Sequence, residues 1–185
     1  MIGGVVLAAG GSARFGSPKQ LADLGGRPLL QHAVDAMLGV PAIEDVVVVL
    51  GANADAIEAA VDPGRARLVL CTDWHRGQAA SLRCGLSALC GHAPVVVVLG
   101  DGPHVTPELI TAVLQRAGDG SARATFDGRP GHPVVLGRSE LARAGELAGD
   151  AGFRDLLDSA RTFEASHLAD PHDIDTPQDL EKIKP

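Results

Sequence analysis

Three glycines and two cations lie in one short segment near the start of the chain. The run Val-Val-Leu-Ala-Ala at residues 5–9 is short and apolar, as expected of a buried strand, and it leads directly into Gly10-Gly11. Arg14, Gly16 and Lys19 follow. Because glycine has no Cβ atom, its backbone N–H groups can approach anionic oxygens, whose charge the two cations would neutralise. The segment predicts a phosphate-binding loop, and the alternative is a tight turn that carries two surface cations.

Two widespread phosphate-binding loops do not fit this segment. The dinucleotide pattern G-x-G-x-x-G fails because Ser12 and Ala13 follow the glycine pair, and the next glycine is Gly16. The Walker pattern needs a lysine directly after its second glycine, where this chain has Ser17. A phosphate site here would therefore use another kind of loop.

A carboxylate follows a long apolar run in the middle of the chain. Residues 94–100 read as a buried strand, and Asp101 comes directly after it. Because the carboxyl ends of parallel strands share one edge of a sheet, we expect Asp101 and the glycine segment to converge on one ligand. Magnesium prefers hard oxygen ligands, of which Asp101 would supply one. The alternative is an aspartate that merely caps or forms the turn.

Two further segments carry weaker signals. Residues 77–81 are expected to form the first turn of a helix, where unpaired N–H groups and the positive end of the dipole suit a nucleotide. Residues 170–175 contain three aspartates directly before the helix start Thr176-Pro177. Such acids usually cap the helix and face water.

The composition favours one globular domain over residues 1–185. The chain can bury a sizeable core, which its 45% hydrophobic and 3% aromatic content assigns mostly to Val, Leu and Ala. A formal charge of −7 argues against a nucleic-acid partner, which would need a basic face. The first residues show no basic leader, and no apolar run is long enough to cross a membrane. The sequence therefore predicts a cytoplasmic protein with no membrane partner.

The order of the expected elements predicts an α/β fold. Strands are expected at residues 5–9, 21–24, 45–51, 68–71, 94–100, 122–126, 132–136 and 162–167. Helices are expected from residue 28 to Pro41, at 53–61, 78–89, 108–116, 139–147 and 152–160, and from Thr176 onward. The alternation argues for a three-layer α/β/α arrangement around a mostly parallel sheet, which binds ligands at the carboxyl ends of its strands.

The glycine segment resembles the loop L-A-A-G-x-S-x-R-[MF]-G-x-x-K of the nucleotidyltransferases that attach nucleotides to molybdopterin. The matching residues are Leu7, Ala8, Ala9, Gly10, Ser12, Arg14, Phe15, Gly16 and Lys19. The resemblance implies a Rossmann-like, nucleotide-diphospho-sugar transferase (GT-A-like) fold. It also implies that Arg14, Lys19 and Asp101 are catalytic, and that the nucleotide contacts Leu7, Ala8, Ala9, Gly10, Gly11, Ser12, Arg14, Lys19, Gly77, Ala79 and Ser81.

Later segments extend the resemblance to most of the chain. Residues 77–86 are similar to G-x-x-x-S-L-R-x-G-L, and residues 173–180 are similar to D-[IV]-D-T-P-x-D-L. In the family the second acid of this D-x-D pair, here Asp175, joins Asp101 in holding Mg²⁺, with Mn²⁺ as the alternative ion. Residues 131–135 and 149–154 resemble segments on the pterin side, which implies the acceptor-binding residues His132, Pro133, Asp150 and Arg154. Two positions differ: Gly102 stands where the family has Gln, and Phe153 replaces a small residue.

The implied activity is attack of a terminal phosphate of molybdopterin on the α-phosphorus of a nucleoside triphosphate, with release of pyrophosphate. Family members with alanine at the position of Ala9 tend to use CTP, which is therefore the favoured triphosphate. A molybdoenzyme that receives the product would be a partner. Two alternatives remain open: a nucleotidyltransferase for a sugar or polyol phosphate, and a non-catalytic chaperone for the molybdenum cofactor.

Overall fold

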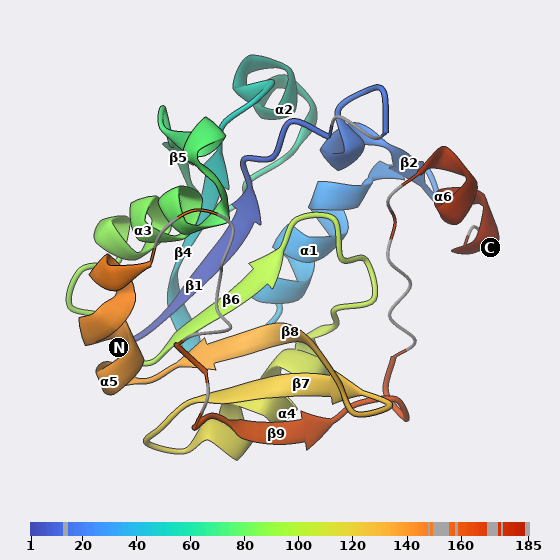
Figure 1. Ribbon diagram of the computed structural model, residues 1–185. Helices are drawn as coiled ribbons and strands as arrows, with labels where there is room; N and C mark the ends of the chain where they lie inside the picture. Colours follow the sequence, from blue (N-terminus) through green and yellow to red (C-terminus); the bar gives the residue numbers. More distant parts are fainter. Residues whose placement is uncertain are drawn as a thin grey trace.

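The computed structural model describes residues 1–12, 15–147, 149, 156–157, 159–169, 174 and 176–183 (Figure 1). Within these residues the main feature is a seven-stranded sheet of order β5-β4-β1-β6-β8-β7-β9, beside a small hairpin of β2 and β3. The strands are β1 Ile2–Ala8, β2 Asp23–Leu24, β3 Arg27–Pro28, β4 Ile43–Leu50, β5 Arg67–Leu70, β6 Val95–Leu99, β7 Ala122–Phe126, β8 Arg129–Leu136 and β9 Arg161–Glu164. The α-helices are α1 Leu29–Leu38, α2 Ala54–Ala60, α3 Gln78–Ala88, α4 Pro107–Ala117, α5 Arg138–Arg143 and α6 Pro177–Ile183.

The sheet is mostly parallel, as predicted. Strands β5, β4, β1 and β6 run in the same direction, and Val5 of β1 is opposite Val47 of β4 and Val97 of β6. Strand β8 is antiparallel to both β6 and β7, whereas β9 is parallel to β7. The order of the strands reverses at β1, because β4 lies on one side of it and β6 on the other. In such sheets this reversal opens a ligand-binding crevice beyond the carboxyl ends of the strands.

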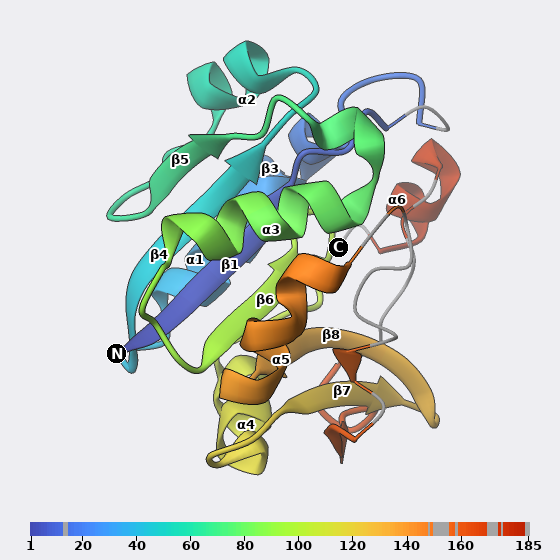
Figure 2. The ribbon, with the colours of Figure 1, turned by 60° about the vertical axis from the view of Figure 1, so that its left-hand side comes forward.

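Helices cover both faces of the sheet and complete the three layers. Alternate strand residues belong to two separate apolar clusters, so that Val6 packs with α1 and α4, whereas Val5 packs with α3. Figure 2 shows α3 and α5 lying across one face. The central strands β1, β4 and β6 are buried on both sides, which explains why they appear in the sequence as continuous apolar runs rich in valine.

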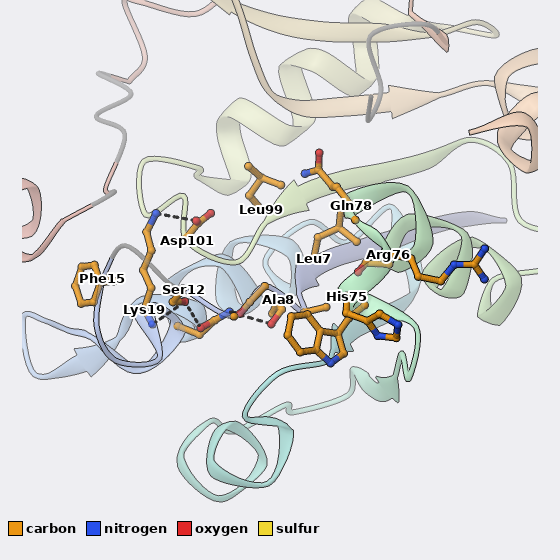
Figure 3. Close-up of a pocket in the computed structure, with 17 residues that line it drawn as sticks. Leu7, Ala8, Ser12, Phe15, Lys19, His75, Arg76, Gln78, Leu99 and Asp101 are labelled. Atoms are coloured by element: carbon orange, nitrogen blue, oxygen red, sulfur yellow. Dashed lines mark hydrogen bonds and ion pairs between the residues drawn. The ribbon is translucent and has the colours of Figure 1, made fainter. Parts of the chain in front are cut away.

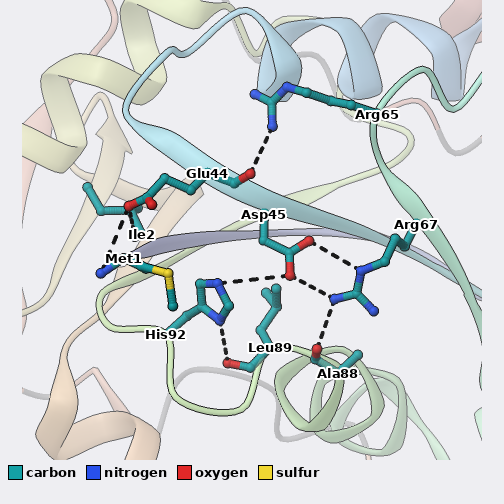
Figure 4. A network of polar contacts seen from close by, with 9 residues as sticks. All are labelled: Met1, Ile2, Glu44, Asp45, Arg65, Arg67, Ala88, Leu89 and His92. Carbon is teal, nitrogen blue, oxygen red and sulfur yellow. Dashed lines mark hydrogen bonds and ion pairs between the residues drawn. The ribbon is translucent and has the colours of Figure 1, made fainter.

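A network of charged groups lies at the edge of the sheet opposite to the carboxyl ends of its parallel strands. Asp45 of β4 receives two hydrogen bonds from the Arg67 guanidinium of β5, which also donates to the Ala88 carbonyl at the end of α3 (Figure 4). These hydrogen bonds hold the pKa of Asp45 below its usual value. The network therefore joins two strands and a helix at this edge, away from the glycine segment.

Some element boundaries differ from the prediction. The strand expected at 21–24 is reduced to β2, because Lys19–Leu21 forms a 3₁₀ turn whose hydrogen bonds run from Leu21 N to Pro18 O and from Ala22 N to Lys19 O. The helix expected at 139–147 ends at Arg143 and continues as a 3₁₀ turn, Ala144–Glu146. The helix expected at 152–160 falls largely outside the described residues. Among those residues, no helix is both long and apolar enough to cross a membrane.

Candidate active site

A cavity of about 640 Å³ lies at the carboxyl ends of β1 and β6 (Figure 3). Four segments form its wall: the loop after β1, the turn Lys19–Leu21, the segment that leads into α3, and the end of β6. The lining residues are Leu7, Ala8, Ala9, Gly10, Gly11, Ser12, Phe15, Lys19, Gln20, Trp74, His75, Arg76, Gly77, Gln78, Ser81, Leu99 and Asp101. Most of the residues that the sequence analysis assigned to the nucleotide therefore surround one cavity.

The loop after β1 has an open side toward the cavity. A Cβ atom on Gly10 would meet nothing within 4 Å, whereas one on Gly11 would lie 3.4 Å from the Trp74 ring. Ser12 adopts a left-handed conformation, with φ of 53°, that is uncommon for a residue with a side chain. The open space beside Gly10 is what a closely approaching ligand requires.

Gln20, which the sequence analysis did not identify as a site residue, supports this loop through side-chain hydrogen bonds. Its side chain is 4% exposed, and its Nε2 donates hydrogen bonds to the carbonyl oxygens of Ala8 at 3.1 Å and Gly10 at 2.8 Å. Its Oε1 accepts a hydrogen bond from the Ser12 hydroxyl at 3.1 Å. A single glutamine in a loop gives no sequence signal for this role, because its burial depends on how the loop folds back over it.

Lys19 and Asp101 meet across the cavity, as the convergence argument predicts. The Lys19 Nζ lies 2.9 Å from Oδ2 of Asp101, and the two side chains are 11% and 37% exposed (Figure 3). The lysine comes from the turn after the glycine loop, and the aspartate follows β6. The ion pair therefore places a nearly buried cation and an accessible carboxylate at the same end of the cavity.

The start of α3 lies on another side of the cavity. Gly77 precedes the helix with φ of 103°, and Gly77, Gln78 and Ser81 line the cavity. Ala79 does not line it: this residue is fully buried, and its N–H donates to the Gly149 carbonyl at 3.1 Å. At the start of α3, Gly77 and Ser81 therefore line the cavity, whereas the backbone N–H of Ala79 is bound to the Gly149 carbonyl.

Trp74 is a cavity residue that the sequence analysis did not identify. It lies in the short 3₁₀ turn Trp74–Arg76 and packs against Gly51, where a Cβ atom would be 2.7 Å from both the tryptophan and the Ala9 carbonyl oxygen. Its signal in the sequence is that it is the one tryptophan of a chain that is only 3% aromatic. Its ring provides an apolar wall beside the glycine loop.

The two described residues assigned to the acceptor lie beside this cavity and are not part of its lining. His132 and Pro133 are in β8, and the His132 Nε2 is buried. Burial lowers the pKa of His132 to about 4, despite the opposing effect of the nearby Asp101 carboxylate. The imidazole is therefore neutral at physiological pH, and it would act on an acceptor as a hydrogen-bonding group without a charge.

Four predicted site residues, Arg14, Asp150, Arg154 and Asp175, lie outside the described residues. Among the described residues, no group of three or more His, Cys, Asp and Glu side chains could hold a metal by itself. Magnesium, however, commonly takes one or two carboxylates and completes its shell with substrate phosphates and water. Asp101, partly exposed at the cavity wall, fits that donor set.

The fold and the cavity together indicate a class of protein. A glycine loop after the first strand, a lysine behind it and an aspartate after a neighbouring strand line one cavity at the carboxyl edge of an α/β sheet, where such sheets bind ligands. The model of the "MobA-like NTP transferase domain" family matches residues 4–166, and the chain belongs to this family. It is a nucleotidyltransferase, and the family implies a nucleoside triphosphate as substrate.

Relatives and solved structures agree with this assignment. The chain is 32% identical to nicotine blue oxidoreductase of Paenarthrobacter nicotinovorans, over 97% of this chain and 95% of that protein. It resembles the crystal structure of Rv0371c from Mycobacterium tuberculosis H37Rv with 28% identity, a TM-score of 0.86 and coverage of 98% and 96%. A nucleotidyl transferase from Methanothermobacter, Mth528, gives 27% identity, a TM-score of 0.82 and coverage of 100% and 96%.

Other comparisons bear on the metal and on the substrate. Rv0371c has also been solved in complex with manganese, and that structure matches this chain with 27% identity, a TM-score of 0.82 and coverage of 98% and 97%. The bifunctional protein GlmU of Sorangium cellulosum is 34% identical over 86% of this chain and 36% of its own length. The bifunctional enzyme IspD/IspF of Rhizorhabdus wittichii is 33% identical over 91% and 42%. The family therefore fixes the type of reaction and leaves the acceptor open.

Proposed function

We propose that this nucleotidyltransferase transfers CMP from CTP to the terminal phosphate of a molybdopterin-type cofactor and releases pyrophosphate. The observation that carries the proposal is the meeting of Lys19 and Asp101, 2.9 Å apart, at a cavity lined by the glycine loop. A triphosphate is an extended polyanion, and this end of the cavity offers it a lysine, backbone amides and a carboxylate suited to its metal.

The reaction requires alignment and charge neutralisation more than proton transfer. A lone pair on the acceptor phosphate oxygen forms the new bond to the α-phosphorus, while the bond from this phosphorus to the bridging oxygen of pyrophosphate breaks. Because the attacking oxygen already carries negative charge, no general base is needed. Lys19 would stabilise the charge that develops on the phosphoryl oxygens and on the leaving pyrophosphate.

The carboxylate would serve the divalent ion. Asp101, together with Asp175 from outside the described residues, would hold Mg²⁺ or Mn²⁺, which neutralises phosphate charge when bound. Arg14 is proposed as a second cation for the triphosphate, and it too lies outside the described residues. The His132 ring, the adjacent Pro133, Asp150 and Arg154 are proposed to contact the acceptor.

The choice of CTP is supported by the surroundings of Ala9. This residue lines the cavity, is 3% exposed and packs in the apolar cluster that contains Val5, and its carbonyl accepts a hydrogen bond from Ala52 N at 3.1 Å, so the residue is held in place. A fixed methyl group there would occupy space that a larger purine needs, which agrees with the tendency of alanine-bearing family members to use CTP.

Specific observations favour two other candidate functions. The similarity to GlmU and IspD/IspF favours a sugar or polyol phosphate as acceptor in place of molybdopterin. The departure of Gly102 from the family pattern, beside Asp101, favours a carrier that binds the cofactor without transferring a nucleotide.

One experiment separates these functions. The purified chain is incubated with Mg²⁺, each of the four common triphosphates in turn and either molybdopterin cofactor, a sugar phosphate or a polyol phosphate, and released pyrophosphate is measured. The proposal predicts release with CTP and molybdopterin only. Release with another phosphate acceptor would replace molybdopterin, and binding without release would favour the carrier.

A further inference from the structure

We propose that Gln20 is the positioning residue of the phosphate-binding loop. It fixes the carbonyl groups of Ala8 and Gly10 on the protein side of the loop and so directs the N–H groups of the residues that follow them, Ala9 and Gly11, toward the triphosphate. The inference rests on the proposed nucleotidyl transfer. It assigns Gln20 a role in shaping the phosphate site, although Gln20 would not itself touch the reacting atoms.

The hydrogen bonds of Gln20 use every polar group of its side chain. The two N–H bonds of Nε2 match the two acceptors, Ala8 O at 3.1 Å and Gly10 O at 2.8 Å, and Oε1 receives the Ser12 hydroxyl at 3.1 Å. The side chain is 4% exposed, so water does not compete for these contacts. A buried amide with all its partners satisfied is rigid, and its contacts lie on the last residue of β1 and on the glycine loop that follows it.

Only a glutamine meets these requirements at this position. Glutamate would turn a carboxylate oxygen toward two carbonyl oxygens, and methionine would leave both carbonyls without the donor they now have. Asparagine keeps the amide but is one methylene shorter, so it could not reach all three partners at once. The specific need for two donors and one acceptor distinguishes Gln20 from a residue that merely fills space.

Peptide geometry carries the effect from the carbonyls to the ligand. In a planar trans peptide the carbonyl of one residue and the N–H of the next point in opposite directions. Because the carbonyls of Ala8 and Gly10 point to Gln20, the N–H groups of Ala9 and Gly11 point away from it. Both residues line the cavity, and anionic oxygens are bound by such outward-facing amides.

Ser12 links this brace to the catalytic lysine. Its hydroxyl donates a hydrogen bond to Gln20 and accepts one from the backbone N–H of Lys19 at 3.1 Å. This hydroxyl therefore connects the loop to the turn Lys19–Leu21 that follows it. The left-handed conformation of Ser12 is unfavourable for a residue with a side chain and persists only where its surroundings hold it. Gln20 and Ser12 together therefore shape the loop before any ligand binds.

The test compares two buried glutamines. Gln31 in α1 is also buried, and its amide donates to Asp35 Oδ1 and to the Asp62 carbonyl while accepting the Asp62 N–H, away from the cavity lining. Gln20→Met and Gln31→Met therefore remove the same amide from two buried networks. Binding of pyrophosphate, CTP and the phosphate-free nucleoside cytidine is followed by the fluorescence of Trp74, the one tryptophan of a chain without tyrosine.

The inference predicts that Gln20→Met weakens pyrophosphate and CTP binding by about tenfold or more, while cytidine binding changes less than about twofold. Gln31→Met should lower the stability of the fold and leave all three affinities unchanged. Deuterium uptake in residues 7–12 should rise in Gln20→Met and not in Gln31→Met. If Gln20→Met does not fold, Gln20→Asn provides the same comparison.

Several results would overturn the inference. Unchanged pyrophosphate binding in a folded Gln20 variant, or an equal loss of cytidine and pyrophosphate binding, would show that Gln20 does not act on the phosphate part of the site. Equal losses of affinity in the Gln20 and Gln31 variants would show a general effect of stability. A wild-type chain that binds neither pyrophosphate nor CTP would contradict the proposed function itself, and the inference with it.

Discussion

Lys19 and Asp101 are bound to each other in the absence of any ligand, although the proposed reaction assigns them to different partners. Their ion pair, 2.9 Å long, involves a lysine that is 11% exposed and an aspartate that is 37% exposed. A metal ion that approaches Asp101 alone must compete with the lysine cation. A metal-bound triphosphate avoids this competition, because its phosphates give Lys19 another anionic partner. Metal binding and nucleotide binding should therefore favour each other.

Replacing the lysine should reverse the preference of the site for its two ligands. Lys19→Gln is expected to bind Mn²⁺ alone several times more tightly than the wild type, because the metal no longer competes with the lysine cation for Asp101. The same variant is expected to bind CTP about tenfold or more weakly, because the phosphates lose a cationic partner. Titration of Mn²⁺ by electron paramagnetic resonance measures the first effect. The control is Lys182→Gln on α6, whose lysine is 64% exposed and paired with Asp179. Weaker binding of Mn²⁺ by Lys19→Gln would contradict the argument.

At the scale of elements, Gly85 allows α3, which carries part of the cavity wall, to pack closely against the sheet. A Cβ atom on Gly85 would lie 2.8 Å from a methyl carbon of Val5 and 2.9 Å from one of Val49. These valines belong to β1 and β4, so the missing Cβ lets the helix lie close to the strands that carry the glycine loop. The same helix presents Ser81 to the cavity.

Gly85→Ala should therefore destabilise the fold even though alanine favours helix formation. We expect a loss of about 1–3 kcal/mol in the free energy of unfolding, because the added methyl group overpacks the interface between α3 and the sheet. Urea denaturation measures this loss. Gly145→Ala is the matched control, because a Cβ atom there meets nothing within 4 Å, and its stability should change by less than about 0.5 kcal/mol. Equal stability of the two variants would contradict the packing argument.

A second element-scale device is the clamp that Glu164 of β9 forms on the turn between β7 and β8. Its carboxylate accepts hydrogen bonds from the Ser166 hydroxyl, from the Thr125 hydroxyl at 3.0 Å and from the amides of Asp127 and Gly128 at 3.0 and 3.2 Å. The Ser166 hydroxyl contributes most to the shift of the Glu164 pKa, which falls from its usual value of 4.5 to about 2.

The clamp should make stability depend on pH in the acid range. The folded-state pKa of Glu164 is depressed, so its stabilising contribution is complete above about pH 4.5 and is lost as the pH falls toward 2. Glu164→Gln should be less stable than the wild type at pH 7, and the difference should shrink between pH 4.5 and 2. Denaturation curves across this range measure the difference. A difference that stays constant with pH would mean that the carboxylate does not form the clamp.

At the scale of the whole molecule, the strands and their mostly parallel arrangement were predictable, whereas the antiparallel pairing within the sheet was not. Continuous valine runs predicted strands buried on both faces, and the rule about carboxyl ends predicted that Lys19 and Asp101 would meet. The antiparallel place of β8 next to β6 was not predictable, because it depends on pairing between residues far apart in the chain. Gln20 and Trp74 were missed for a similar reason: their roles follow from burial under the folded loop and not from residue spacing.

We propose a joint role for Asp101 and Lys19, which is to hold a metal-bound triphosphate for nucleotidyl transfer. Its most direct test is the rate of pyrophosphate release from CTP in the presence of Mg²⁺ and molybdopterin cofactor, compared between the wild type and Asp101→Ala, with Asp55→Ala on the exposed surface of α2 as the control. We predict that Asp101→Ala is slower by a factor of about 100 or more, a loss of about 3 kcal/mol of transition-state stabilisation, while Asp55→Ala is unaffected. A rate for folded Asp101→Ala close to that of the wild type would contradict it.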